Sequence, residues 1–91
     1  MISIELSKRF KKIVREARRE EEVSGTLRLL RDGFGQPHAH SGLGIRKLGK
    51  HLYECLTGLE WRLVFTASKG VLVFDFAGDH DGVQNYLRGK R

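Results

Sequence analysis

The 91-residue chain has few of the residues that cross-link a protein or embed it in a membrane. Its one cysteine, Cys55, excludes an intramolecular disulfide and argues against a zinc module built on cysteines. No apolar run approaches the roughly 20 residues that a transmembrane helix needs. The charges near the N-terminus follow a short apolar patch, the reverse of a signal peptide. The sequence therefore predicts one cytoplasmic domain over residues 1–91, with no membrane partner.

Acidic residues are also in short supply. The chain has 17 Lys and Arg against 11 Asp and Glu, a formal net charge of +6. An excess of this size in a small domain favours a polyanionic partner, most often a nucleic acid. A surface that contacts an acidic protein is the alternative.

The apolar pattern changes period along the chain. Residues 2–6 alternate as in a strand, and Ser7 is placed to cap a helix whose apolar residues recur at helical spacing. A second helical segment ends near Asp32-Gly33, and a Gly-rich loop over residues 33–44 follows. The later strands are expected at 44–48, 51–56, 61–66 and 71–76, with a last helical turn at 81–87. This order, β-αα-ββββ, predicts an α+β fold in which an N-terminal strand and a helical hairpin pack on an antiparallel sheet.

The aromatic residues have two interpretations. Trp61, Phe65, Phe74 and Phe76 are expected to fill the core, and a platform for stacking nucleobases is the alternative.

Several histidines and basic residues could carry chemistry. His38 and His40 lie in the Gly-rich loop, and His80 follows the last expected strand. Imidazole exchanges protons near neutral pH, and arginine binds phosphate through a bidentate fork. Together they suit RNA cleavage by the 2′-hydroxyl, which needs proton transfer and cations but no metal. The candidate phosphate-binding residues are Arg46, Lys47, Lys50, Arg62 and Arg88.

Other sites fit the sequence less well. A zinc site made from His38, His40 and His80 lacks a fourth ligand, because Cys55 falls in an expected strand. A calcium loop near residues 79–82 lacks acids at its first and last ligand positions. A dinucleotide fingerprint at residues 33–35 lacks its third glycine. We therefore expect no metal and no cofactor.

Residues 38–87 resemble toxins of the RelE/ParE superfamily from bacterial toxin–antitoxin systems. The matching motifs are Arg46-Lys47-Leu48, Leu52-Tyr53-Glu54, Trp61-Arg62-Leu63-Val64-Phe65, Val71-Leu72-Val73-Phe74 and Gly78-x-His80. The resemblance implies the RelE-like microbial RNase fold. It also implies an mRNA interferase that cleaves mRNA in the ribosomal A site, inhibits translation and is neutralised by a cognate antitoxin.

Similar members, of the YafQ and HigB type, suggest which residues act. His38 or His40 matches a loop histidine, Glu60 matches an acid before the Arg62 strand, and His80 matches a C-terminal histidine that transfers a proton. Leu56 departs from the pattern, since the family carries arginine or histidine in this catalytic position. The sequence leaves three explanations: an introduced change that weakens a toxic protein, natural divergence, or an alignment offset by one residue. Of these we favour the first.

Two alternative functions are also compatible with the sequence, one with the same fold and one with the same basic charge. A ParE-like inhibitor of DNA gyrase would have the same architecture without needing histidines that transfer protons. A non-catalytic nucleic-acid-binding module would show salt-dependent affinity and no cleavage.

Overall fold

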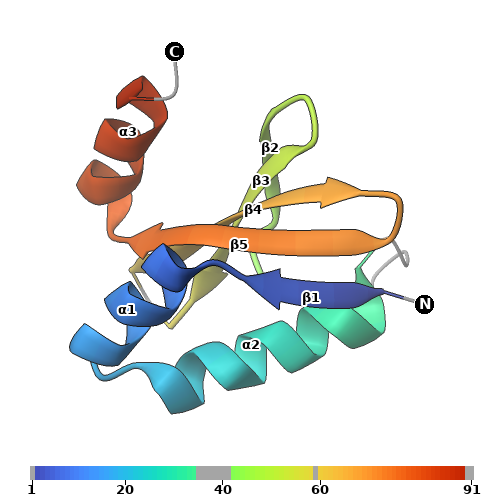
Figure 1. Ribbon diagram of the computed structural model, residues 1–91, viewed down its shortest axis with the longest axis horizontal. Helices are drawn as coiled ribbons and strands as arrows, with labels where there is room; N and C mark the ends of the chain where they lie inside the picture. Colours follow the sequence, from blue (N-terminus) through green and yellow to red (C-terminus); the bar gives the residue numbers. More distant parts are fainter. Residues whose placement is uncertain (1, 35–41, 59, 90–91) are drawn as a thin grey trace.

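The computed structural model describes residues 2–34, 42–58 and 60–89 (Figure 1). The elements in chain order are β1 (Ser3–Leu6), α1 (Lys8–Glu16), α2 (Glu20–Gly33), β2 (Arg46–Gly49), β3 (Leu52–Thr57), β4 (Trp61–Ser68), β5 (Val71–Gly78) and α3 (His80–Gly89). The α+β class and the β-αα-ββββ order are confirmed. The last helical turn expected at 81–87 is longer than predicted, because it forms the ten-residue helix α3.

The strands form one five-stranded sheet in the order β1-β5-β4-β3-β2. Strands β2 to β5 form an antiparallel meander, and β1 joins at the edge in parallel with β5. The sheet is therefore mixed rather than wholly antiparallel. The chain between the two parallel strands, from α1 to β4, is far longer than the dozen or so residues that a parallel connection requires.

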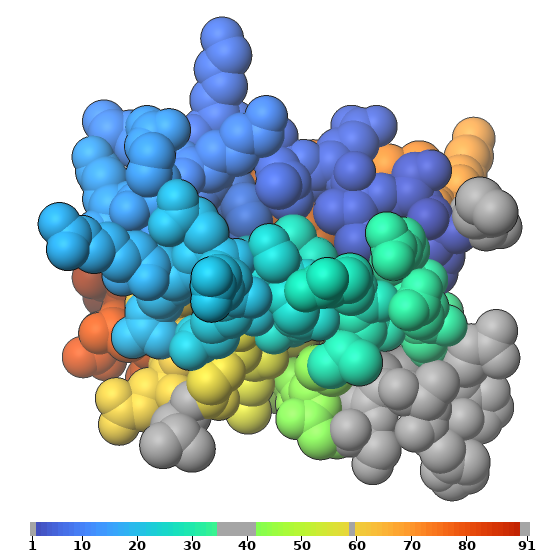
Figure 2. Space-filling view, turned by 90° about the horizontal axis from the view of Figure 1, so that it is seen from below, coloured from blue at the N-terminus to red at the C-terminus, as the bar shows by residue number. Residues whose placement is uncertain are grey.

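Helices α1 and α2 cover one face of the sheet, whereas α3 stands on the other side, at the end of β5 (Figure 1). Figure 2 shows the helical face, where α1 and α2 lie side by side over the sheet. The core lies between these layers and includes Phe10, Leu30, Phe65 and Phe74. The rings of Phe65 and Phe74 stack with centroids 4.8 Å apart. The burial of such side chains is the main source of stability in a domain this small.

The ends of α1 follow local sequence rules. The Ser7 hydroxyl accepts a hydrogen bond from the Phe10 N–H at 3.0 Å, which confirms the predicted cap. At the other end Arg18 adopts a left-handed conformation with φ 56°. Its N–H donates to the Arg15 carbonyl, and the Arg19 N–H donates to the Val14 carbonyl. This Schellman pattern ends α1 and lets α2 leave in a new direction.

A bulge in β5 reverses which side chains face the core. Phe65 pairs with Phe74, but Val64 pairs with Phe76, so Asp75 is the extra residue. The prediction that Phe76 fills the core with Phe74 is therefore wrong. Phe76 lies on the opposite face and stacks on Tyr86 of α3, with ring centroids 4.5 Å apart. The Tyr86 hydroxyl donates a hydrogen bond to the Asp75 carboxylate at 2.6 Å, and this bond links α3 to the sheet.

No helix among the described residues is long and apolar enough to cross a membrane.

Candidate functional site

The side chains of interest lie on the sheet face away from α1 and α2. Side chains alternate along a strand, so core residues such as Cys55 and Leu63 leave Glu54 and Arg62 on the other face. Strand pairing places Leu56 directly opposite Arg62, and Glu54 opposite both Val64 and Arg46. Glu54 and Arg62 are therefore diagonal neighbours, within reach of long side chains.

Glu54 binds two arginines. Its carboxylate accepts a hydrogen bond from Arg62 Nη1 at 2.6 Å and lies 4.0 Å from Arg46 Nη1. Glu54 is only 4% exposed, so the arginine partners are what make its buried charge tolerable. The Arg62 Nε is buried and makes no hydrogen bond to any described residue. The hydrogen bond to Glu54 thus fixes the position of the Arg62 guanidinium.

A hollow of about 260 Å³ opens beside Arg62, lined by Glu60, Arg62, Asp79, His80 and Asp81. It lies where the start of β4 meets the first turn of α3. Asp79 caps that helix, because its carboxylate accepts a hydrogen bond from the Gly82 N–H at 2.7 Å. His80 is the first residue of α3 and is exposed. The turn that starts α3 therefore brings an imidazole beside a guanidinium.

Carboxylates outnumber cations around this hollow. Glu60, Asp79 and Asp81 face Arg62 and His80, so the site repels an approaching phosphate more than the sequence suggests. A polyanion would need to be positioned by something other than this hollow's own charge.

Leu56 lies opposite Arg62 on the neighbouring strand and packs on the loop before β2. Its N–H donates to the Leu43 carbonyl at 2.7 Å. A Cβ added at Gly44 would lie 2.7 Å from Leu56 Cδ1, so the glycine makes room for the leucine side chain. The position predicted as catalytic is thus next to Arg62 and holds an apolar group.

The structure does not bring the other candidate residues together. Lys47 follows Arg46 on β2 and points to the other face, and Lys50 lies in the turn at the far end of β3. Arg88 is eight residues beyond His80 on α3, about 12 Å along the helix axis. Their role in binding RNA stays a prediction. His38 and His40 lie outside the described residues.

No group of described residues is arranged to hold a metal ion. Cys55 is fully buried, and burial, followed by the nearby charge of Glu54, raises the pKa of its thiol to about 12. Because a thiolate is the nucleophilic form, this cysteine is chemically inert in the folded chain.

Glu54, Asp79 and Asp81 were not identified as site residues from the sequence. A signal existed for Glu54, which is the only acid in an otherwise apolar strand and falls on the same face as Arg62. Asp79 and Asp81 gave no such signal, because acids are common at the start of any helix.

The fold resembles that of several solved toxins. The crystal structure of YafQ from E. coli strain BL21(DE3) is 20% identical, with a TM-score of 0.66 over 91% of this chain and 98% of that chain. A copper-bound mutant toxin from Helicobacter pylori is 19% identical, with a TM-score of 0.72 over 91% of this chain and 99% of that chain. YafQ in the E. coli DinJ-YafQ complex is 20% identical, with a TM-score of 0.67, and the match covers 91% and 98% of the two chains.

No protein-family model matches the chain, and no curated protein matches it. The structural matches cover nearly the whole length of each compared chain. About one residue in five is identical between this chain and each of those proteins. At this level of identity they establish architecture. The chain therefore has the fold of YafQ and of the Helicobacter pylori toxin.

Proposed function

We propose that the chain is the toxin of a toxin–antitoxin system and acts as a metal-independent endoribonuclease on mRNA in the ribosomal A site. The observation that carries this proposal is the meeting of His80, Glu60 and Arg62 in one hollow. The YafQ-like fold supports it, as does the known YafQ structure in complex with the antitoxin DinJ.

The reaction uses groups that the hollow supplies. The 2′-oxygen of a ribose attacks the adjacent phosphorus, and the bond from phosphorus to the 5′-oxygen breaks. The products are a 2′,3′-cyclic phosphate and a 5′-hydroxyl. His80 and Glu60 exchange the two protons, one taken from the 2′-hydroxyl and one given to the leaving oxygen. Arg62, which lines the hollow, stabilises the negative charge that develops on the phosphoryl oxygens.

The excess of carboxylates around the hollow supports dependence on the ribosome. Free RNA would be repelled by Glu60, Asp79 and Asp81, although the net charge of +6 on the whole chain attracts it. A ribosome that holds the mRNA in place removes the need for the toxin to bind RNA by charge alone.

The test is primer extension on an mRNA incubated with purified ribosomes and the chain, its Leu56→Arg variant, or Leu56→Arg combined with His80→Ala. We expect cleavage at an A-site codon, more of it with Leu56→Arg, and a loss of 10²- to 10⁴-fold when His80 is removed, the usual range for a general acid or base. The matched control is His51→Ala, an exposed histidine at the far end of β3. Cleavage unaffected by His80→Ala would refute the proton-transfer role. A block of DNA supercoiling without cleavage would favour a gyrase inhibitor.

A further inference from the structure

Helix α3 depends on its contacts with the sheet. It has ten residues, and Gly82 lies near its start. Isolated helices shorter than about 12 residues are marginal in water, and an internal glycine weakens a helix further. Among the described residues of α3, Val83 is the one buried side chain, at 1% exposed. The position of His80, the first residue of the helix, therefore depends on the few side chains that hold α3 on the sheet.

Tyr86 makes the second contact of α3 with the sheet. Its ring stacks on Phe76, with centroids 4.5 Å apart and an angle of 13° between the ring planes. Its hydroxyl donates a hydrogen bond to the Asp75 carboxylate at 2.6 Å. Burial, followed by this hydrogen bond, raises the pKa of Tyr86 above its ordinary value. The hydroxyl therefore remains a donor throughout the pH range in which a histidine exchanges protons.

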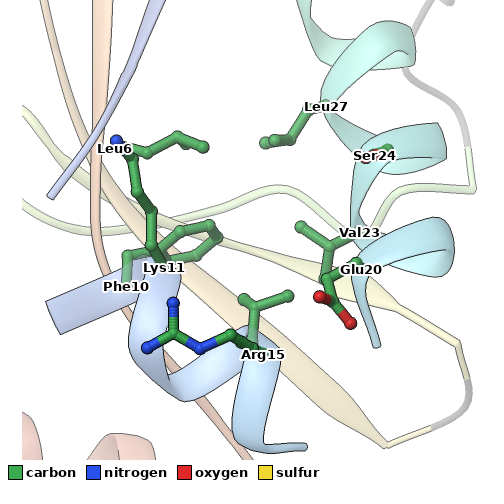
Figure 3. A pocket seen from close by; sticks show the side chains of 9 residues that line it. Leu6, Phe10, Lys11, Arg15, Glu20, Val23, Ser24 and Leu27 are labelled. Atoms are coloured by element: carbon green, nitrogen blue, oxygen red, sulfur yellow. The ribbon is translucent and has the colours of Figure 1, made fainter. Parts of the chain in front are cut away.

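Arg9 of α1 reaches Asp75 and Tyr86 around the edge of the sheet. Figure 3 shows Phe10 across from Val23, on the side of α1 that faces α2. Successive side chains project about 100° apart around a helix, so Arg9 points out of the space between the two helices. Its Nη1 lies 3.8 Å from an Asp75 oxygen, and its guanidinium carbon lies 5.7 Å from the centre of the Tyr86 ring. Arg9 thus contacts both partners of the hydrogen bond that holds α3.

We propose that Arg9, Asp75 and Tyr86 form a positioning network that fixes α3 on the sheet. The network keeps His80 beside Arg62, with which it lines the hollow. In the described structure none of the three network residues lines the hollow, so each acts through the placement of α3 rather than by touching RNA. The consequence for cleavage rests on the proposed function, in which His80 transfers a proton.

The spacing along α3 makes Tyr86 and His80 move together. Val83 lies three residues from each of them, about 4.5 Å along the helix axis in either direction. If α3 tilts about the buried Val83 side chain, a rise of about 1 Å at Tyr86 displaces His80 by a similar distance. A misplacement of about 1 Å can slow a reaction by a factor of about 10². Loss of the Tyr86 hydrogen bond should therefore slow cleavage although every side chain of the hollow is still present.

A double-mutant cycle tests whether Tyr86 acts through His80. Single-turnover cleavage on ribosomes is measured for the Leu56→Arg chain alone and with Tyr86→Phe, His80→Ala or both. Phenylalanine keeps the stack on Phe76, so we expect Tyr86→Phe to lower the rate constant by about tenfold rather than 10²-fold, with an unchanged half-saturating concentration of the chain. With His80→Ala present, Tyr86→Phe should have no further effect. A contribution of Tyr86 to folding alone would lower the rate equally in both backgrounds.

Hydrogen exchange tests the placement of α3 without ribosomes. NMR measures the exchange of the amides of residues 83–87 in the native chain. Loss of a hydrogen bond to the Asp75 carboxylate, which is 36% exposed, should raise the open fraction of α3 about tenfold in Tyr86→Phe. Loss of the exposed ion pair in Arg9→Gln should raise it only about twofold.

Two matched controls accompany these variants. Tyr53→Phe removes the same atom from a tyrosine that packs against the core on the α1–α2 side of the sheet. Lys8→Gln removes the charge of an exposed residue next to Arg9 in α1. Neither control should change the exchange of the α3 amides or the rate constant of cleavage.

Three results would overturn the proposal. Tyr86→Phe could leave the rate constant unchanged or lower it equally with and without His80, which would show that Tyr86 does not act through His80. It could instead raise the half-saturating concentration, which would show that Tyr86 contacts the RNA or the ribosome. The α3 amides could also exchange alike in Tyr86→Phe and Tyr53→Phe, which would show that the bond does not hold α3. If the Leu56→Arg chain cleaves no mRNA, the proposed nuclease fails, and hydrogen exchange alone decides whether the network holds α3 in place.

Discussion

Replacement of Arg62 by leucine, alone and together with Glu54, should distinguish the contribution of Arg62 to folding stability from its contribution to RNA cleavage. Glu54 is only 4% exposed in the parent chain, and Arg62→Leu leaves its carboxylate with Arg46 alone, 4.0 Å away. Removing one partner of a buried ion pair typically costs about 3–5 kcal/mol. Because the Arg62 side chain is 24% exposed, we expect the lower end, about 3 kcal/mol. For a domain of this size that corresponds to a fall in Tm of roughly 12–24 °C.

The companion variant replaces both partners. Glu54→Leu combined with Arg62→Leu removes the unpaired charge and should return the free energy of unfolding to within about 1 kcal/mol of the parent. Urea unfolding followed by the fluorescence of Trp61, the single tryptophan, measures all four corners of this double-mutant cycle. Ribosome-dependent cleavage, in contrast, should be lost in both variants that lack Arg62. A double variant as unstable as the sum of its single changes would refute this account of the pair.

Three further predictions concern single residues. Arg18→Gly should raise the free energy of unfolding by about 0.5–1 kcal/mol in urea titrations, because it relieves a left-handed residue at φ 56°; no gain would show that the turn is unstrained. Gly44→Ala should cost more than about 1 kcal/mol, since φ is +61° and the new methyl group would meet Leu56, and a melting curve unchanged from the parent would contradict this packing. Cys55 should react with a thiol reagent at pH 8 only as fast as the chain unfolds. Its folded pKa of about 12 exceeds the unfolded value of about 8.5, so stability should fall as pH rises through this window; rapid labelling of the native chain would refute the burial.

The fold could be predicted where the signals are local. The Ser7 hydroxyl and the helical spacing after it mark the start of α1, and alternation in β3 and β4 places Cys55 and Leu63 together in the core. The parallel pairing of β1 could not be predicted in the same way. It depends on contact between β1 and β5, which are far apart in the sequence, and the sequence of neither strand alone indicates its partner.

The site was predictable only in part. His80 and Arg62 were identified by residue type and do lie together. The bond from Arg62 to Glu54 depends on the register between β3 and β4, which follows from a turn that composition does not specify. Lys50 and Arg88 were grouped with Arg62 because they are basic, and the fold holds them at other ends of the sheet and of α3.

The bulge at Asp75 decides on which side of the molecule the chain finishes. A strand reverses the direction of its side chains with every residue, so one additional residue turns everything after it by half a revolution. Deletion of Asp75 would send Phe76 into the crowded interior and carry α3, with His80 at its start, toward the α1–α2 layer. The imidazole would then be separated from the guanidinium by the thickness of the sheet. A single inserted amino acid thereby determines which side of the sheet the last helix covers.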